Sequence, residues 1–146
     1  MRYVKMILRL ILAFTWELPQ TIIALFILLG LKIGGKNPDV TFNSYYWAFH
    51  IRQNCDYFGV GLSCFFTFNV SNVMLGNVFE QTVKHEAGHT IQSAILGWLF
   101  IPLVALPSVT FNILTRLNLV SYDKYYFRIW EKTASILGIS SLGVKK

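Results

Sequence analysis

The chain is 146 residues long, which is the size of one ordinary domain. Apolar residues make up 54% of it and charged residues only 14%, which leaves too little polar surface for a soluble protein and predicts an integral membrane protein. The formal net charge is +6, but the basic residues are scattered beside apolar segments, a pattern that suits anionic membrane lipids and argues against nucleic acid as a partner.

Residues 1–36 are predicted to form an N-terminal membrane segment. Apolar residues dominate 6–16 and 21–31, and Pro19 lies between the two runs. Because proline breaks or kinks a helix, two arrangements fit this segment. It is either one long kinked span, or an interfacial amphipathic helix followed by a second helix that begins near Pro19.

The charged residues before Pro19 favour the second arrangement. Arg2, Lys5 and Arg9 are distributed along the first run as they would be on a helix at a membrane surface. Glu17 would be costly inside a bilayer unless its carboxylate faces protein or water. A cleavable signal peptide is not expected, because no small-residue cleavage site follows the apolar run.

The stretch LKIGGKNPD at 31–39 is expected to end the first membrane element. Residues 40–75 are rich in Phe, Tyr and Val and are predicted to form a minor β or irregular cover of two or three strands. Cys55 and Cys64 lie here, either as free thiols or, in an oxidising compartment, as a disulfide. A zinc knuckle would need further ligands, and only His50 is near in sequence.

Residues 76–97 are predicted to form a helix that carries the motif KHEAGH. His85 and His89 are four residues apart, so their rings project from one face of the helix and can bind one tetrahedral zinc ion. Glu86 lies beside them, where it can accept a proton from a water at the metal without being a ligand. This H-E-x-x-H arrangement predicts a zinc hydrolase, and the alternative is a structural histidine pair.

Two further residues of this helix have expected roles. Gly88 would leave room for a strand or a substrate close to the helix. Gln92 follows His89 by three residues and shares its face, so it would either orient that ligand or bind a backbone group.

Residues 98–117 are predicted to form a second membrane segment. Pro102 and Pro107 lie inside this apolar run. Prolines at these positions indicate a kinked span or a re-entrant hairpin.

A zinc ion held by two histidines needs a third protein ligand, and Glu131 is the preferred candidate. It lies 42 residues after His89, in the middle of a helix predicted over 122–138. Ala134 and Ser135 are small enough to let this helix pack closely on the motif helix. The alternative for Glu131 is a surface charge beside a lysine. The other candidate ligands are His50, Asp39, Asp56 and Asp123.

The motif with a later glutamate resembles the gluzincin branch of zinc metallopeptidases. The resemblance implies that His85, His89 and Glu131 bind zinc and that Glu86 is the general base. The order WELPQT, KHEAGHTIQS and WEKTASILG is also similar to a group of small bacterial proteins with the pattern W-E-L-P-Q-T, H-E-Y-G-H-x-x-Q-S and T-E-K-x-A. This chain departs from that pattern at two positions: Ala87 replaces the usual tyrosine, and Trp130 replaces the threonine before Glu131.

The sequence thus predicts one mainly α-helical domain, a small integral membrane protein of a bacterial cytoplasmic membrane with a zincin-like active-site helix. Its expected cofactor is Zn²⁺, and its expected reaction is hydrolysis of a peptide bond in a membrane-associated protein or peptide. Two alternatives stay open. One is hydrolysis of an ester or amide in a lipid or cell-wall precursor, and the other is a non-catalytic metal-binding membrane subunit.

Overall fold

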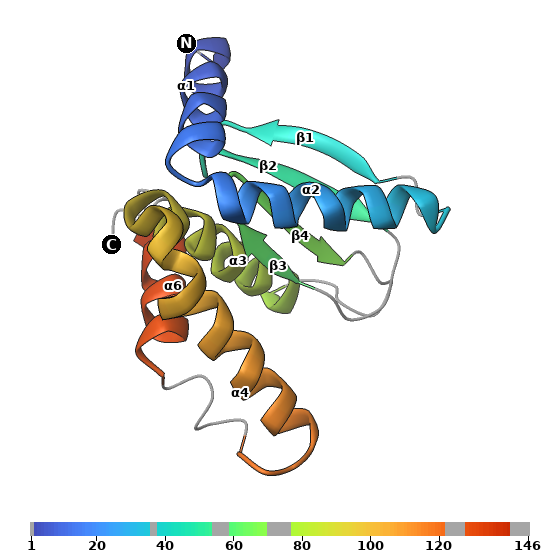
Figure 1. The fold of residues 1–146 in the computed structure, drawn as a ribbon, viewed down its shortest axis with the longest axis vertical. Coiled ribbons are helices and arrows are strands. Elements are labelled where there is room, and N and C mark those ends of the chain that lie inside the picture. The colour runs from blue at the N-terminus through green and yellow to red at the C-terminus, as the bar shows by residue number, and fades with distance from the viewer. Residues whose placement is uncertain (1, 36–37, 54–58, 70–76, 122–127, 141–146) are drawn as a thin grey trace.

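The structure, a computed structural model, describes residues 2–35, 38–53, 59–69, 77–121 and 128–140 (Figure 1). Within these ranges the chain is mainly α-helical and has one small β-sheet. This confirms the predicted balance of secondary structure.

The N-terminal segment folds as two helices, α1 (Arg2–Thr15) and α2 (Leu18–Ile33), which are bent by 104° relative to each other. Pro19 lies in the first turn of α2, where its missing N–H group leaves no helical hydrogen bond unmade. The prediction of two helices with a break near Pro19 is therefore confirmed. After α2 the chain turns at Gly35, whose φ of 72° is readily adopted only by glycine.

Within the described ranges, no individual helix combines the length and the hydropathy needed to cross a bilayer. The helices α1 and α2 meet both requirements only when they are counted together across their bend. The membrane location of the chain therefore stays a prediction.

The next segment forms a four-stranded sheet rather than the two or three strands that its composition predicted. The strands are β1 (Asp39–Asn43), β2 (Ala48–Gln53), β3 (Val60–Leu62) and β4 (Phe65–Asn69), in the spatial order β1-β2-β4-β3. Two antiparallel hairpins are joined by a parallel pairing of β2 with β4. The second hairpin turns at Ser63 with a φ of 53°, and it lacks the Asn-Gly pattern by which such turns are recognised.

The motif helix α3 (Asn77–Leu96) ends where Gly97 adopts a φ of 57°, as the sequence predicted. A 3-10 turn (Gly97–Leu99) and a π-helical turn (Ile101–Ala105) then lead into α4 (Leu106–Arg116). Pro102 and Pro107 each lie in the first turn of a helical segment, where proline is tolerated. The predicted segment 98–117 is thus a broken helix, and no residue of α4 is buried.

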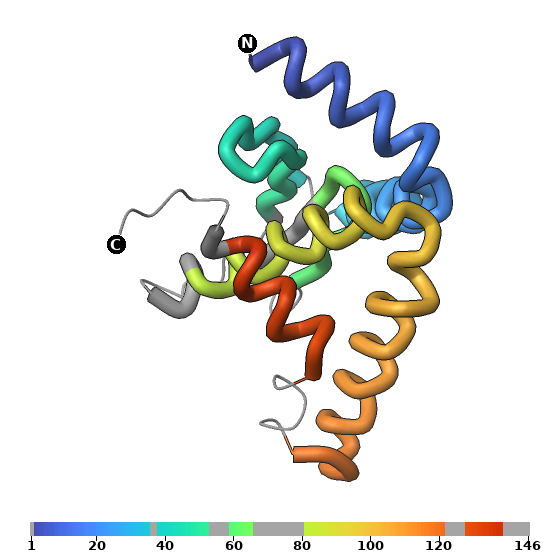
Figure 2. Tube along the Cα trace, turned by 90° about the vertical axis from the view of Figure 1, so that its left-hand side faces the viewer, coloured from blue at the N-terminus to red at the C-terminus, as the bar shows by residue number. Residues whose placement is uncertain are grey.

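The last helix, α6 (Ile129–Ser140), packs across α3. Figures 1 and 2 show α1 and α4 extending toward opposite ends of the long axis, with the sheet, α3 and α6 between them. The helix α2 packs on the sheet, where Ala24 joins a buried cluster with Ile51 and Phe65. The strand β3 lies against α3, which brings the sheet to the motif helix.

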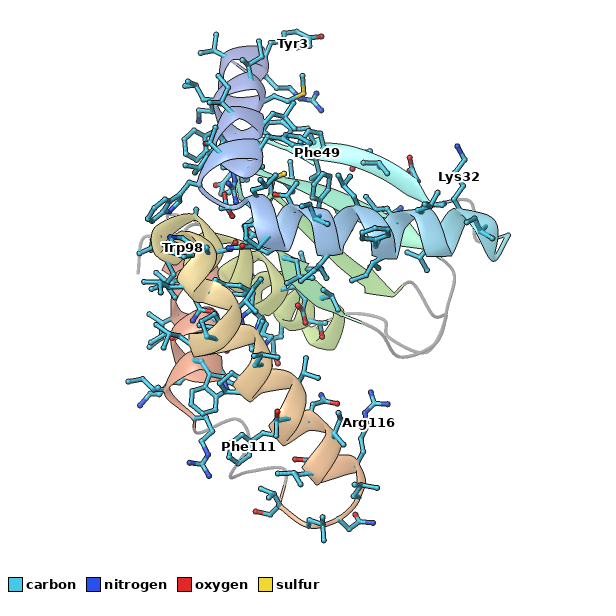
Figure 3. All side chains as sticks on the ribbon, viewed as in Figure 1. Tyr3, Lys32, Phe49, Trp98, Phe111 and Arg116 are labelled. Carbon is cyan, nitrogen blue, oxygen red and sulfur yellow. The ribbon has the colours of Figure 1, made fainter. Side chains whose placement is uncertain are left out.

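On α1 and α2, three polar side chains are buried and many large apolar side chains face outward, which is unusual for a soluble protein. The helix α1 buries Arg9, and α2 buries Gln20 and Thr21. The exposed large apolar residues of the two helices are Tyr3, Val4, Ile7, Leu8, Ile11, Phe14, Leu18, Ile22, Ile23, Leu25, Phe26, Leu29 and Ile33. Figure 3 shows Tyr3 and, near the end of α3, Trp98 projecting from the surface.

Arg9 differs from its expected role. The sequence predicted a membrane-surface residue, but only 2% of Arg9 is exposed. Its guanidinium group forms an ion pair with Glu17, which is completely buried. The ion pair explains how both charges leave water, since a buried charge is tolerated when it is paired and hydrogen-bonded.

Candidate metal centre

The three residues predicted as zinc ligands come together in the structure. His85 and His89 lie one turn apart on α3, and Glu131 lies in the first turn of α6 rather than in the middle of its helix. The Oε2 atom of Glu131 is 2.9 Å from Nε2 of His85 and 3.4 Å from Nε2 of His89. One ligand atom from each of the three residues lies within 4.8 Å of the other two.

This spacing suits a small metal ion. Zinc binds imidazole nitrogen and carboxylate oxygen at about 2.0–2.2 Å in a tetrahedral arrangement, which separates neighbouring ligand atoms by roughly 3.3 Å. The two observed nitrogen–oxygen distances, 2.9 and 3.4 Å, lie on either side of that value. Two histidines and one carboxylate are also the ligand set of catalytic zinc sites that keep a fourth position open. The residues therefore fit zinc in both geometry and chemistry.

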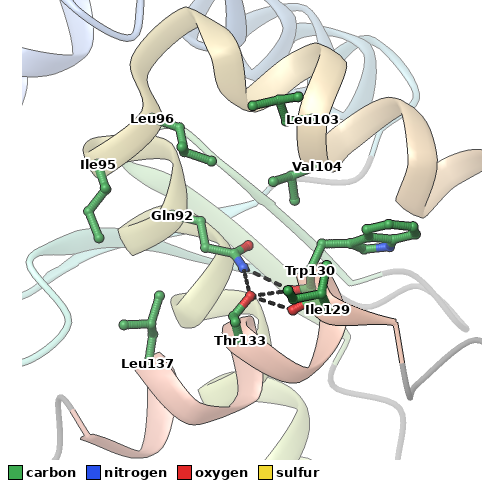
Figure 4. A pocket seen from close by; sticks show the side chains of 9 residues that line it. All are labelled: Gln92, Ile95, Leu96, Leu103, Val104, Ile129, Trp130, Thr133 and Leu137. Atoms are coloured by element: carbon green, nitrogen blue, oxygen red, sulfur yellow. Dashed lines mark hydrogen bonds between the residues drawn. The ribbon is translucent and has the colours of Figure 1, made fainter.

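Gln92 determines which nitrogen of His89 faces the other ligands. The Nε2 amide group of Gln92 donates to the backbone oxygen of Trp130 at 2.8 Å and contacts the hydroxyl group of Thr133 at 2.7 Å (Figure 4). A carbonyl oxygen only accepts hydrogen bonds, so the amide oxygen of Gln92 must be the atom 2.8 Å from Nδ1 of His89. Nδ1 of His89 is then the donor, and Nε2 is the nitrogen that faces Glu131. Gln92 thus orients His89 and also binds a backbone group, and these are the two roles that the sequence left open.

Ser135 has the same effect on His85. Its hydroxyl group donates to the backbone oxygen of Glu131 at 3.2 Å and lies 2.9 Å from Nδ1 of His85. Because its proton is used in the first contact, the hydroxyl oxygen accepts from Nδ1–H of His85 in the second. Sequence reasoning considered Ser135 only for its small size. Its position one turn after Glu131 was the signal that could have identified it as a hydrogen-bond partner of His85.

These two contacts direct Nε2 of both rings toward the carboxylate of Glu131. The negative charge of that carboxylate requires a positive charge nearby, which protons on the rings or a bound metal ion can supply. Metal-binding histidines characteristically donate their second ring nitrogen to a neighbouring acceptor. The orientation of His85 and His89 is therefore the one that metal ligands require.

The burial of Glu131 excludes the alternative that it is a surface charge. Glu131 is completely buried, whereas its neighbour Lys132 is exposed. Burial alone would raise the pKa of Glu131, but hydrogen bonding to His85 and His89 outweighs burial and holds this pKa well below its usual range. A hydrogen bond from Ser108 acts in the same direction. The carboxylate is consequently ionised at neutral pH, as a metal ligand must be.

Glu86 lies next to the ligands, and its carboxylate contacts the strand β3. A β-carbon on Gly59 would stand 2.6 Å from Oε1 of Glu86, and the backbone N–H of Gly61 hydrogen-bonds to the same carboxylate. Burial raises the pKa of Glu86, and the charges of His89 and His85 oppose that increase. A carboxylate with a raised pKa is a stronger proton acceptor, which suits a general base.

The two ligand-bearing helices are in direct backbone contact. A β-carbon on Gly88 would stand 1.8 Å from the backbone oxygen of Ala134, and one on Gly138 would stand 1.8 Å from that of Lys84. The sequence predicted that Gly88 admits a strand or a substrate, but the structure fills that place with α6. The expectation that Ala134 lies at a close helix contact is confirmed.

The remaining candidate ligands do not join this group. His50 lies in β2, and burial together with the charge of Arg52 lowers its pKa to about 4, so it is neutral at pH 7. Asp39 lies in β1, opposite Arg52 in the strand pairing. Asp56 and Asp123 fall outside the described residues.

The two cysteines are only partly placed. Cys64 is a free, completely buried thiol, and burial raises its pKa to about 11. The disulfide that the sequence left open is therefore not formed at Cys64, and Cys55 falls outside the described residues.

An apolar cavity of about 260 Å³ adjoins the centre (Figure 4). The residues that line it are Gln92, Ile95, Leu96, Leu103, Val104, Ile129, Trp130, Thr133 and Leu137. Gln92 belongs both to this wall and to the hydrogen bond on Nδ1 of His89. Gln92 therefore connects the wall of the cavity to His89.

Comparison with known proteins adds no family to this picture. Searches against family models, curated proteins and solved structures found no match. The candidate centre is defined by three ligands of this chain, His85, His89 and Glu131, with Glu86 beside them.

Proposed function

We propose that this protein is a zinc-dependent hydrolase of the membrane that cleaves a peptide bond in a membrane-associated protein or peptide. The observation that carries the proposal is the hydrogen bonding of His85 and His89. Each ring donates through Nδ1 and directs Nε2 at the carboxylate of Glu131, which is the preparation that a zinc site requires. The resemblance of the motif to gluzincin metallopeptidases favours the peptide bond as the bond cleaved.

The roles of the residues follow from their contacts. His85, His89 and Glu131 would hold the metal. A bound zinc ion polarises a substrate carbonyl group and makes water acidic enough to act as a nucleophile at neutral pH. Glu86 accepts the proton of the attacking water and delivers it to the leaving amine. The contact of Glu86 with the N–H of Gly61 holds its carboxylate beside the ligands.

An intact general base supports catalysis over a structural role for the metal. A structural zinc site needs no proton acceptor and closes its fourth position with another protein ligand, most often cysteine. Cys64, the cysteine that the described residues include, is absent from the group formed by His85, His89 and Glu131.

The membrane location is supported by the reversed burial on α1 and α2. Exposed Ile, Leu, Phe and Val side chains would be costly in water, at about 25 cal/mol for each Å² of apolar surface. The same side chains are stable against lipid chains. The helix α4, which buries no residue and exposes Leu106, Val109 and Ile113, adds to this apolar surface.

The test compares Glu86→Gln with Glu131→Gln. Glu86→Gln should keep about one zinc ion per chain and lose peptide hydrolysis, because only the proton acceptor is removed. Glu131→Gln should lose both, since a neutral amide is a poor zinc ligand. Elemental analysis measures the metal, and a mixture of fluorogenic peptides in detergent micelles measures hydrolysis, with His85→Ala as the metal-free control.

Three results would contradict the proposal. Wild-type protein that is purified without chelator and contains no transition metal would refute the metal site. Loss of metal from Glu86→Gln but not from Glu131→Gln would refute the assigned roles. Cleavage of lipid or cell-wall esters and amides, with no cleavage of any peptide, would leave the zinc chemistry but replace the substrate class.

A further inference from the structure

The buried ion pair of α1 and α2 reaches the metal-site helix by hydrogen bonds. Arg9 Nη2 donates to the backbone oxygen of Thr90 at 3.2 Å, and Thr90 directly follows the ligand His89. The hydroxyl group of Ser93 donates to Oε2 of Glu17 at 2.6 Å. Both members of the pair are thus bound to the turn of α3 that also holds a metal ligand.

The same pair is fixed to the sheet. Arg9 donates to the backbone oxygen of Ser63 at 2.9 Å and to that of Trp47 at 3.1 Å. Thr21, one turn after Glu17, exchanges a hydrogen bond of 2.6 Å with the hydroxyl group of Ser63. Trp47 and Ser63 lie in the turns of the two hairpins, so the network joins α3 to the turns of the sheet.

A second contact holds the end of α3. The ring of Trp16 lies against Gly97, where a β-carbon would stand 2.3 Å from the ring, and Gln20 donates its amide to the backbone oxygen of Gly97. The motif WELPQT thus contacts α3 through Glu17, and it contacts the 3-10 turn that follows α3 through Trp16 and Gln20. Its polar residues face α3 and the sheet, while its apolar residue Leu18 is exposed.

We propose that Arg9 and Glu17 are positioning residues for the metal centre, which fix the rotation of α3 relative to Glu131. This inference rests on the proposed zinc site. A helix that is held only by apolar packing can rotate about its own axis at small cost. The hydrogen bonds at Thr90 and Ser93 oppose such a rotation of α3. A rotation of about 10° moves an imidazole nitrogen, which lies roughly 6 Å from the axis, by about 1 Å. Functional sites tolerate displacements of only about 0.5 Å.

Because Arg9 and Glu17 are both buried, breaking their ion pair is expected to be costly. Removing one partner of a buried ion pair leaves an unpaired charge and is strongly destabilising, but replacing both by apolar groups of similar volume is often tolerated. The double variant Arg9→Met with Glu17→Leu should therefore keep the fold while losing the hydrogen bonds to Thr90 and Ser93.

The experiment compares two matched single substitutions as well as the double variant. Ser93→Ala removes one buried hydroxyl group that joins the network to α3. Thr21→Val removes one buried hydroxyl group of the same network that contacts Ser63 and the backbone of Ala13 and Glu17, with no bond to α3. Both substitutions should lower thermal stability to a similar extent. If the network only stabilises the fold, both variants should therefore have the same effect on the metal site.

The readouts are the visible absorption spectrum of the Co²⁺-substituted protein and the affinity for Zn²⁺ measured against a chromophoric chelator. We expect the Co²⁺ bands to shift in Ser93→Ala and in the double variant and to stay unchanged in Thr21→Val. Zinc affinity should fall by about tenfold in the double variant, the lower end of the loss seen for residues outside the ligand shell.

The outcomes separate this inference from the proposed function. Wild-type protein without stoichiometric metal would refute the zinc site and the inference together. Wild-type protein with metal, and a Ser93→Ala spectrum that matches both wild type and Thr21→Val, would refute the positioning role alone. Ser93→Ala keeps the ion pair, so it decides the matter even if the double variant does not fold.

Discussion

Gly88 and Ala134 are in backbone contact, and a β-carbon at Gly88 would stand 2.5 Å from the carbonyl carbon of Ala134 as well as 1.8 Å from its oxygen. Gly88 directly precedes the ligand His89, and Ala134 follows the ligand Glu131 by three residues. The distance between the two helices at this crossing therefore sets the distance from Glu131 to His85 and His89, the proposed metal ligands.

Gly88→Ala should destabilise the protein and abolish metal binding. The new methyl group would meet backbone atoms, which cannot rotate away, and overpacking of this kind costs about 1–3 kcal/mol or more. Thermal unfolding and elemental analysis measure the two effects. Gly30→Ala is the matched control, because a β-carbon there meets no atom within 4 Å and alanine favours a helix by about 1 kcal/mol. A Gly88→Ala protein with wild-type zinc content would show that the crossing does not set the ligand geometry.

Gln92→Ala and Ser135→Ala should each weaken zinc binding by about 10–100-fold while leaving the three ligands in place. Each substitution removes the acceptor for Nδ1–H of one histidine, which frees that ring to rotate or to change tautomer. Competition with a chromophoric chelator measures the affinity. Thr133→Val is the control, since Gln92 keeps its bond to the backbone of Trp130. Unchanged affinity in both alanine variants would contradict the tautomers assigned to His85 and His89.

The protein should stay in the membrane fraction after washing with 1 M salt or with carbonate at about pH 11. High salt reduces the Debye length to about 3 Å and removes binding by surface charge, but it does not release exposed apolar helices from lipid. Immunoblots of the pellet and the supernatant measure the distribution. A chain that salt alone releases would be bound by Arg2 and Lys5 rather than by the apolar faces of α1 and α2.

The thiol of Cys64 should react slowly with alkylating reagents in the folded protein. Burial raises its pKa to about 11, so at pH 8 only about one molecule in a thousand carries the reactive thiolate. The measurement uses a Cys55→Ser background and mass spectrometry, and urea should restore fast alkylation. A native rate equal to that in urea would place the thiol in contact with water.

Several features of the centre were predictable from sequence because they depend on local spacing. His85 and His89 share a helix face at any place where residues 85–89 are helical, and Glu86 must then lie beside them. Pro19 and Gly97 mark helix boundaries by their own backbone chemistry.

Other features depend on which faces meet, and spacing alone does not determine that. Arg9 was interpreted as a membrane-surface charge because Glu17, its partner, is eight residues away, in the turn between α1 and α2. Gly88 was assigned to a strand or a substrate because the sequence does not show where α6 lies. The parallel pairing of β2 with β4 was missed for the same reason, since neither strand carries a signal for its neighbour.

The proposed ligands come from two helices that are far apart in sequence, and this affects when the protein could bind its metal during synthesis. During synthesis, His85 and His89 emerge long before Glu131, which follows His89 by 42 residues. A metal captured at that stage would be held by two imidazoles alone, with weak affinity and little selectivity among divalent ions. If the proposed zinc site is correct, selective loading would have to wait until α6 has been made and has docked on α3 through Gly88 and Gly138. Docking of the last helix would then be the step that completes the proposed metal site.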